Sequence, residues 1–485
     1  MPEMLPAVAL LTFHPQEIPG TNLLADVSIL ERTYRQLHPG LLRYNTPAEM
    51  EGHFRQLRAD VSNGATLGEA FLAFSEFAAK VQCSHTHANF YNQPKATAEA
   101  LFGGRNRLPF HFIWLDDRMV VTKDQTSNGT LPPGTEIVSL DGRPAKAVLR
   151  RLLRMARADG ANDAKRRADL EVQGVGRYEA FDVFYPLCFP PKGESARLVV
   201  RRPRDRGPSV VEARYIAPEQ RRPLESVPSG GVVPWSFRQL EPRTGYLRMP
   251  TWALYNSKWD WKVFLDATFA QLSANGSDLV IDLRGNEGGI DVGTEILRHV
   301  VVRPLDVASQ ARYTRYRHVP SYLRGNLDTW DPSFYDWGKS ATSPRYVPEA
   351  RTDLFRMTRF DDGSAMDRIE PNSPRYTGKL GVLVDASNSS ATFQFAQIVK
   401  RERVGTLVGT TLGGNRRGLN GGAFFFLTLP NSRIELDVPL VATISGTPQP
   451  DGPIEPDLRV RRTAEGIAMG RDEVLEASLQ HLKRG

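Results

Sequence analysis

The amino-acid sequence predicts an α/β fold in which a core of parallel strands follows a helical N-terminal region and a small β-rich domain. Apolar runs with β-branched residues at 245–249, 279–283 and 381–384 precede polar loops or segments of helical period. Strand, helix and strand at this spacing are typical of a parallel βαβ unit. Apolar residues recur at helical spacing before Val81, and short strand-like runs separated by turn residues lie between 108 and 202.

Length and composition are consistent with several folded units. A chain of 485 residues with 40% hydrophobic and 24% charged side chains has a globular composition, and this length corresponds to about two to four domains. We predict a helical region at 1–103, the β-rich domain at 104–216 and the core at 217–485. An insertion at 301–376 interrupts this core.

Charge and cysteine content restrict the possible partners. The formal net charge is +7 and the isoelectric point is about 9.3. Lys and Arg are scattered among acidic residues, whereas nucleic-acid binding requires a basic face with interleaved aromatic residues, so we expect no nucleic-acid partner. Cys83 and Cys188 are too few for a disulfide framework and lack metal-site spacing, which leaves one disulfide or two free thiols.

No apolar run of the sequence reaches transmembrane length. The run within residues 1–14 has neither a basic leader nor a small-residue cleavage site, so it is a poor signal peptide. We therefore expect a soluble chain that is either cytoplasmic or has lost an export signal before this numbering begins.

Helix signals dominate the region before Val81. Apolar side chains follow a helical period in 22–60 and again in 67–81, while His38–Gly40 ends the first helix and Thr46 before Pro47 starts the next. These signals predict three helices.

The β-rich domain and its flanks have mixed signals. Residues 110–122 predict two strands around Asp116–Asp117, and residues 131–153 predict a turn, a strand, an Asp-Gly turn and an amphipathic helix. A long helical excursion is predicted over 146–172. Residues 203–234 are rich in Pro, Arg, Ser and Gly, which predicts a linker.

The stretch 381–400 combines a strand, a sharp polar turn and a helix. A hydroxyl in such a turn stands at the helix N-terminus, where free N–H groups can stabilise an oxyanion. Ser390, just before Ala391, is therefore the candidate nucleophile. The alternative is that Ser387, Ser389 and Ser390 only cap the helix.

A second stretch at 277–289 ends a buried-type strand in the letters DLRGNEGG. The strand carries Asp282 and Arg284. The paired glycines Gly288 and Gly289 allow the backbone to approach a ligand closely.

Together these two stretches resemble the core of the tail-specific (C-terminal processing) protease and tricorn-core superfamily of serine peptidases, which includes the interphotoreceptor retinoid-binding proteins. The resemblance continues through Leu407–Asn415 and Pro450–Asp457 and covers about 245–460. It implies a ClpP/crotonase-like catalytic core. The letters PGTEIVSLDGRP at 133–144 resemble part of a PDZ domain, although a β-rich spacer remains the alternative. The resemblance also favours an exported or periplasmic location.

The general base differs from that of one branch of this superfamily. Bacterial tail-specific proteases use a Ser-Lys dyad, but the matching position here is Asn415, flanked by Arg416 and Arg417. Arginine stays protonated and is a poor general base. We expect the base to come from elsewhere and assign Asn415 and Arg416 to substrate binding.

The tricorn-like branch takes a Ser-His pair from a segment before the nucleophile, and Ser84–His85 fits that motif. The resemblance therefore implies His85 as general base, with His87 as the second choice. It also implies an acidic residue near the end of the core. Asp451 is favoured over Glu455, because the letters IEPD match the part of the motif beyond the catalytic acid.

These residues predict a serine peptidase that cleaves polypeptides through an acyl-enzyme, without a metal or organic cofactor. The N–H groups of Ala391 and of Gly288 or Gly289 would hold the oxyanion. One alternative is a non-catalytic ligand- or peptide-binding protein on the same fold. Another is an esterase or amidase with a small substrate, because specificity depends on cleft shape.

The insertion at 301–376 is rich in Tyr, Trp and Arg and is too long for an ordinary loop. It hangs between the strand before Gly288 and the strand before Ser390, which predicts a lid over the cleft. An oligomer contact or an exposed elaboration is the alternative.

Overall fold

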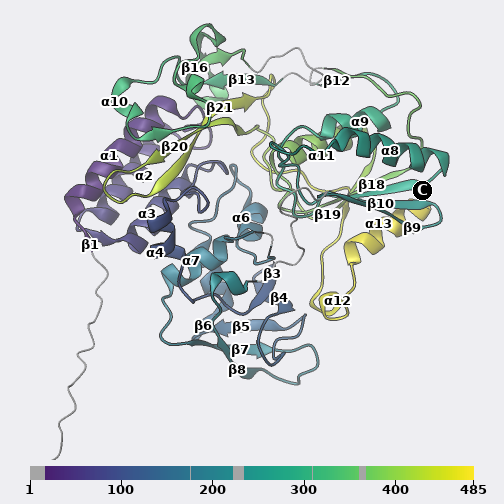
Figure 1. Ribbon diagram of the computed structural model, residues 1–485, viewed down its shortest axis with the longest axis horizontal. Coiled ribbons are helices and arrows are strands. Elements are labelled where there is room, and N and C mark those ends of the chain that lie inside the picture. The colour runs from purple at the N-terminus through teal and green to yellow at the C-terminus, as the bar shows by residue number, and fades with distance from the viewer. Residues whose placement is uncertain (1–16, 175, 222–233, 308–309, 360–367, 485) are drawn as a thin grey trace, which may run out of the picture.

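The computed structural model describes residues 17–174, 176–221, 234–307, 310–359 and 368–484. The apolar run within 1–14 and the middle of the predicted linker, 222–233, lie outside these ranges. Figure 1 shows helices and a long hairpin on one side, a small β-rich domain below, and a sheet flanked by helices on the other side. No helix in the described ranges is long and apolar enough to cross a membrane.

The core contains a six-stranded sheet with the order β22-β19-β18-β11-β10-β9. Its strands are β9 (Ser236–Glu241), β10 (Thr244–Arg248), β11 (Asp278–Asp282), β18 (Leu380–Val384), β19 (Thr406–Gly409) and β22 (Leu458–Arg459). All neighbouring pairs are parallel except β10 with β9. The predicted parallel core is therefore confirmed.

Helices cover both faces of this sheet. They are α8 (Trp261–Ala274), α9 (Gly293–Val300), α11 (Ser390–Glu402) and α13 (Glu473–Arg484). Figure 1 shows the first three on one side and α13 on the other. The sequence of β11 shows why both faces are covered. Leu279 and Ile281 pack in one apolar cluster. Val280 points to the other face and packs with Val474 and Leu482. A strand buried on both faces needs such a continuous apolar run.

The N-terminal helices are α1 (Gly20–Leu37), α2 (Pro47–Val61), α3 (Leu67–Lys80) and α4 (Lys95–Phe102). The three helices predicted before Val81 are confirmed. Thr46 and Glu49 form a capping box at the start of α2, and Thr66 and Glu69 form another at α3, which satisfies N–H groups that would otherwise lack partners. Two short strands, β1 (Glu17–Ile18) and β2 (Ala65–Thr66), pair beside them.

The second six-stranded sheet has the order β14-β20-β21-β13-β16-β15. Its strands are β13 (Ala311–Thr314), β14 (Leu327–Asp328), β15 (Ala341–Val347), β16 (Thr352–Met357), β20 (Asn420–Thr428) and β21 (Glu435–Ile444). Strands β20 and β21 pair antiparallel and form a long hairpin. Four strands of the insertion extend this hairpin, so the described insertion is built into a sheet.

Smaller elements complete the insertion and the C-terminal part. They are β12 (Leu305–Asp306), α10 (Ser321–Arg324), the 3-10 helices η2 (Pro332–Tyr335), η3 (Gly338–Ser340) and η4 (Pro348–Ala350), β17 (Arg368–Ile369) and α12 (Ala464–Ala468). Strand β12 pairs with β17.

The β-rich domain has the strand order β3-β4-β5-β7-β8, with β6 paired to β5. Its elements are β3 (Phe110–Leu115), β4 (Arg118–Asp124), β5 (Glu136–Leu140), β6 (Arg143–Pro144), α5 (Ala145–Leu152), α6 (Asp163–Asp169), α7 (Ala180–Cys188), β7 (Ser195–Arg201) and β8 (Ser209–Arg214). The 3-10 helix η1 (Pro218–Gln220) follows. Cys83 and Cys188 are free thiols.

Two predictions for this part of the chain are wrong. The helical excursion over 146–172 is broken between α5 and α6, because Gly160 adopts a φ of +54° and Asn162 caps a new helix through Lys165 N–H. The predicted linker at 203–234 contains β8, since its alternating apolar residues pair with β7. The strand was not predicted, because the residues on both sides of β8 have the composition of turns.

Candidate active site

Ser390 lies at the turn between β18 and α11. It is the first residue of the helix and has a φ of +49°, a conformation that costs energy for a non-glycine residue and is often found at functional sites. Among the described residues, Ser390 Oγ has no hydrogen-bond partner. Ser389 is the N-cap residue, but its hydroxyl donates to Glu287 O at 3.1 Å instead of capping the helix.

Asn388, which is fully buried, fixes the turn by hydrogen bonds to the loop after β11. Its amide nitrogen donates to Leu283 O at 2.6 Å and to Asn286 O at 3.0 Å. These bonds join the end of β18 to the loop after β11. The serine turn and the glycine loop are therefore one hydrogen-bonded unit.

Gly288 lies directly against the serine turn. It has a φ of +102°, and a Cβ at this position would lie 3.0 Å from Ala391 N and 3.1 Å from Ser390 Cβ. Gly288 N–H donates to Asn286 Oδ1 at 2.9 Å. In the described structure, the N–H groups of Gly289 and Ala391 have no hydrogen-bond acceptor.

The segment after α3 places Ser84 between His85 and a buried carboxylate. Ser84 Oγ donates to Asp159 Oδ2 at 2.6 Å and lies 3.4 Å from His85 Nδ1, and Ser84 N–H donates to Asp159 Oδ1 at 3.1 Å. Asp159 is 3% exposed. Burial lowers the pKa of His85 below its ordinary value of 6.5, so the imidazole is neutral near neutral pH.

The acidic residue that contacts Ser84 is Asp159. The two acids predicted from the sequence, Asp451 and Glu455, do not contact it in the described structure. Asp451 Oδ1 accepts from Asn415 Nδ2 at 2.7 Å and from Ala161 N–H at 3.0 Å. Asn415 Nδ2 also donates to Asp159 O at 3.1 Å. Asp451 thus supports the loop that carries Asp159.

Glu455 lies farther along the same segment. Its carboxylate accepts from Thr411 Oγ1 at 2.9 Å, and its side chain is 53% exposed. It forms no hydrogen bond or ion pair with Ser84, His85 or Asp159 in the described structure.

Sequence reasoning missed Asp159 because the residue lies inside the segment predicted as helix. The letters DGAN at 159–162 are turn formers, and such a cluster favours a break between two helices. That signal could have identified the loop. Nothing in the sequence pattern places this loop under Ser84.

His87 faces a different group. Its Nδ1 lies 3.9 Å from Asp437 Oδ2, and Asp437 accepts from Asn89 at 2.7 Å and from Asn92 at 2.9 Å. Burial lowers the pKa of His87 well below 6.5 and raises the pKa of Asp437 to about 6. No hydrogen bond links His87 to Ser84 or Asp159 among the described residues.

Glu287 connects the loop after β11, which carries Gly288 and Gly289 (the glycine loop), to the segment after α3, which carries Ser84 and His85 (the histidine segment). Its carboxylate forms ion pairs with Lys165 and, at 3.3 Å, with Arg157, and Arg157 also donates to Ser84 O at 3.2 Å. Burial alone would raise the pKa of Glu287, but the two cations lower it below its ordinary value. The described structure has no direct hydrogen bond between Ser390 and His85, and this bridge is one of the contacts that link their segments.

Asn415 and Arg416 have mainly internal contacts. Asn415 is buried and uses its amide nitrogen as described above, while its oxygen accepts from Arg417 N–H at 3.0 Å. Arg416 N–H donates to Gly452 O at 3.0 Å. A substrate-binding role for these two residues stays a prediction.

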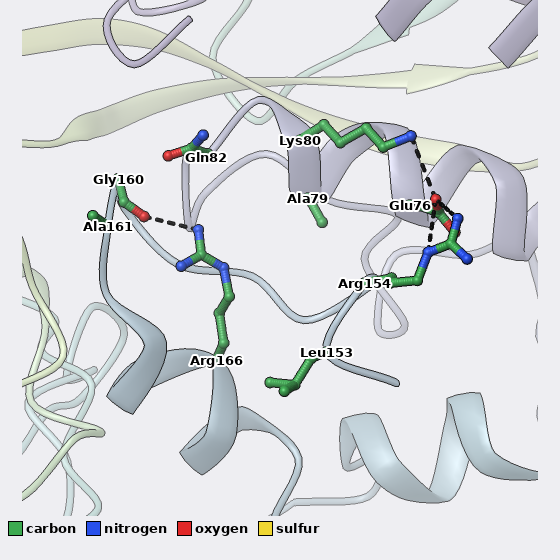
Figure 2. A pocket seen from close by; sticks show the side chains of 9 residues that line it. All are labelled: Glu76, Ala79, Lys80, Gln82, Leu153, Arg154, Gly160, Ala161 and Arg166. Atoms are coloured by element: carbon green, nitrogen blue, oxygen red, sulfur yellow. Dashed lines mark hydrogen bonds and ion pairs between the residues drawn. The ribbon is translucent and has the colours of Figure 1, made fainter. Parts of the chain in front are cut away.

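A cavity of about 400 Å³ is lined by residues of α3 and of the segment from the end of α5 to α6 (Figure 2). Its lining includes Glu76, which pairs with Lys80 and Arg154, and Arg166, which donates to Gly160 O at 2.8 Å. Gly160 N–H donates to Gln82 O at 2.9 Å in the wall of this cavity. Gly160 follows Asp159 in the chain, so the cavity adjoins the loop that carries Asp159, and Ser390 does not line it.

One group of side chains could hold a metal ion. Asp266, Glu295 and His299 have ligand atoms within 4.8 Å of one another. They come from α8 and α9, and Lys262 and Arg298 each lie 3.9 Å from Glu295. None of these side chains contacts the serine turn in the described structure.

A serine at a strand-to-helix turn beside a glycine loop, with a neutral histidine on a neighbouring segment, is an arrangement that serine hydrolases use. Residues 243–460 match the model of peptidase family S41. The match covers the core of the chain, which is that of a serine-type peptidase. No curated protein sequence matches the chain.

The fold has solved counterparts. The structure of mature CPAF complexed with lactacystin matches with a TM-score of 0.62 at 16% identity, covering 96% of this chain and 97% of that one. A second structure of mature CPAF gives a TM-score of 0.60 at 16% identity and covers 96% of each chain. A photosystem II D1 C-terminal processing protease gives a TM-score of 0.40 at 14% identity, covering 94% of this chain and 98% of that one. At so low an identity, the likeness to CPAF shows a shared fold.

Proposed function

We propose that this protein hydrolyses peptide bonds of polypeptides through an acyl-enzyme formed on Ser390. The observation that carries this proposal is the position of Ser390, whose left-handed φ of +49° turns an unbonded hydroxyl out of the β18–α11 turn. A nucleophilic serine on a strained strand-to-helix turn is exposed to substrate in this way. His85 accepts the serine proton and returns it to the leaving amine.

The contacts of Ser84 support the tautomer that His85 needs. A hydroxyl has one proton to donate, and Ser84 Oγ donates it to Asp159 at 2.6 Å. Ser84 Oγ can then only accept at its contact with His85 Nδ1. Nδ1 therefore carries the proton, which leaves Nε2 with a free lone pair as the base.

We assign the oxyanion site to the N–H groups of Ala391 and Gly289. Ala391 lies in the first turn of α11, where N–H groups lack intrahelical partners and the helix dipole favours negative charge. Of the two glycines predicted for this role, Gly288 already donates to Asn286. Its missing side chain gives the substrate carbonyl room beside Ser390.

We further propose that 104–216 is a PDZ-like domain, that the core is ClpP/crotonase-like, and that the protein is tail-specific. The antiparallel sheet with α5 and α7, and the parallel sheet covered by helices on both faces, are consistent with these assignments. The alternatives are a non-catalytic binding protein and an esterase or amidase.

Labelling with a fluorophosphonate probe tests the nucleophile. We expect wild-type protein to be labelled, Ser390→Ala to be unlabelled, and the nearby Ser387→Ala to keep most of its labelling as the matched control. Because neutral His85 is the active form, labelling should increase with pH through a midpoint below 6.5. His85→Ala should reduce the rate by roughly 10³-fold, whereas Lys400→Ala, whose amine pairs with Asp457 at 2.7 Å, should not.

Labelling that survives Ser390→Ala would contradict the proposal. Folded wild-type protein that is never labelled would favour the non-catalytic binding protein. Labelling at Ser390 together with turnover of small esters but of no polypeptide would favour the esterase.

A further inference from the structure

A strip of aromatic side chains leads away from His85 across the outer face of β20. It consists of Phe424, Phe426 and Trp330, and we call it the aromatic strip. The ring centroid of Phe424 lies 5.8 Å from that of His85, and Trp330 lies 6.0 Å from Phe424 and 5.8 Å from Phe426. Trp330 is 59% exposed.

A β-bulge directs these side chains outward. Gly421 faces Val441 and Phe424 faces Pro439, so the register of β20 against β21 shifts between them, with Gly422 at a φ of +76°. After the bulge, Ala423, Phe425 and Leu427 are buried in the core while the two phenylalanines between them are only partly buried. Bulges near active sites commonly re-aim side chains in this way.

The outer edge of β20 also lacks a paired strand beside the strip. In the described ranges, β14 pairs with β20 only at Phe426 and Leu427, so the stretch from Asn420 to Phe425 has no strand partner on that side. A peptide in extended conformation can lie along such an edge. A strip of apolar rings, of which Trp330 is exposed, adjoins this unpaired edge and the histidine, and it favours an extended peptide with apolar side chains.

We propose that the aromatic strip binds apolar side chains of the leaving-group half of a peptide substrate, the residues that follow the scissile bond. This inference rests on the proposed function. His85 must hand its proton to the leaving amine, so the substrate chain beyond that nitrogen starts at His85. The next surface along this direction is Phe424 and then Trp330.

Spacing supports this assignment. Side chains on one face of an extended chain repeat every two residues, a distance of about 7 Å. The ring separations from His85 to Phe424 and from Phe424 to Trp330 are close to this repeat. Alternate residues after the scissile bond can therefore each meet a ring. The three rings of the strip carry no charge, so a charged side chain would lose hydration against them. Trp330 and Phe424 thus select apolar residues on the leaving-group side.

Acyl transfer measures this half of the site directly. An ester substrate acylates the enzyme, and added dipeptide amides then compete with water for the acyl group. We expect wild type to prefer a leucine-containing amide over an aspartate-containing one. Trp330→Ala should lower that preference about 10-fold, Trp330→Phe should largely retain it, and Tyr346→Ala should not change it. Tyr346 is the matched control, because it is 62% exposed on β15, at the opposite edge of the same sheet.

Fluorophosphonate labelling of each variant distinguishes a failure of the proposed function from a failure of the aromatic-strip inference alone, because that reaction involves no leaving peptide. Normal labelling with an unchanged amide preference in Trp330→Ala would overturn this inference alone. A changed preference only for residues before the scissile bond would also overturn it. Absent labelling of folded wild type would overturn the proposed function and this inference with it.

Discussion

Among single residues, the direction of one hydrogen bond determines whether His85 can act as a base. Ser84 Oγ donates to Asp159, so the proton of His85 is kept on Nδ1. The same carboxylate also accepts Ser84 N–H, which fixes the backbone of the histidine segment. In the proposed mechanism, Asp159 is therefore a positioning residue that acts through Ser84.

Replacing Asp159 by Asn should invert this arrangement. The Asn amide can donate to Ser84 Oγ, which frees the hydroxyl to donate to His85 Nδ1 and moves the imidazole proton to Nε2. The wrong tautomer should lower the labelling rate of Ser390 by roughly 10²- to 10⁴-fold, with little change in thermal stability. The rate and the unfolding midpoint of each variant give the measurement.

Asp451→Asn is the matched control for that substitution. Asp451 accepts hydrogen bonds from Asn415 and Ala161 and forms none with Ser84 or His85 in the described structure, so its effect on labelling should be smaller. Equal losses in both variants would show that the acid predicted from the sequence contributes as much as Asp159.

Among elements, the loop after β11 and the turn before α11 act as one unit. Asn388 bonds to Leu283 O and Asn286 O, Ser389 bonds to Glu287 O, and Gly288 contacts the nucleophile turn. The left-handed φ of Ser390 persists because these neighbours hold it.

Gly288→Ala should therefore disturb the nucleophile. The new Cβ would meet Ala391 N at 3.0 Å and Ser390 Cβ at 3.1 Å, and the φ of +102° adds backbone strain. We expect labelling to decrease at least 10-fold and the unfolding free energy to fall by about 1–3 kcal/mol. Gly285→Ala separates strain from contact, since Gly285 has a φ of +79° but open space around its Cβ position. Equal loss of labelling in both variants would argue against the contact.

The periodicity of apolar residues predicted those helices and strands whose pattern is complete within a short stretch of sequence. The strand before Ser390, the strand before Gly288 and the helices before Val81 all follow from local apolar patterns. The strands of the insertion were not predicted, because β13 is defined by pairing with β21, which lies far along the chain. The break at Gly160 was missed because the turn formers at 159–162 lie between two stretches that are rich in Ala, Leu, Lys and Arg, which are strong helix formers.

Across the whole molecule, the candidate site spans all three parts of the chain. Ser390 belongs to the core, Ser84 and His85 follow the N-terminal helices, and Asp159 lies in the β-rich domain. Short motifs could identify the first three, since each motif is continuous. Asp159 acquires its role only through the packing of the α5–α6 loop under Ser84, which no local pattern encodes.

The ion pairs of Glu287 with Lys165 and Arg157 join the core to the β-rich domain. Lys165 is 3% exposed, so Glu287→Gln would leave its ammonium group without an acidic partner in this contact, a situation that is costly for a buried charge. We expect lower thermal stability and slower labelling at Ser390, because the loop next to Gly288 loses its anchor. Glu455→Gln is the matched control, since its side chain is 53% exposed against 49% for Glu287 and it does not join the two parts.

The pH dependence of stability tests the same bridge. The pKa of Glu287 is lowered from 4.5 in the folded protein, so its contribution is present above that pH and is lost as the pH falls through the folded value. The unfolding midpoints of wild type and Glu287→Gln should therefore differ at neutral pH and converge in acid. A constant difference at every pH, or a Glu455→Gln variant that behaves in the same way, would show that the charge of Glu287 does not hold the two parts together.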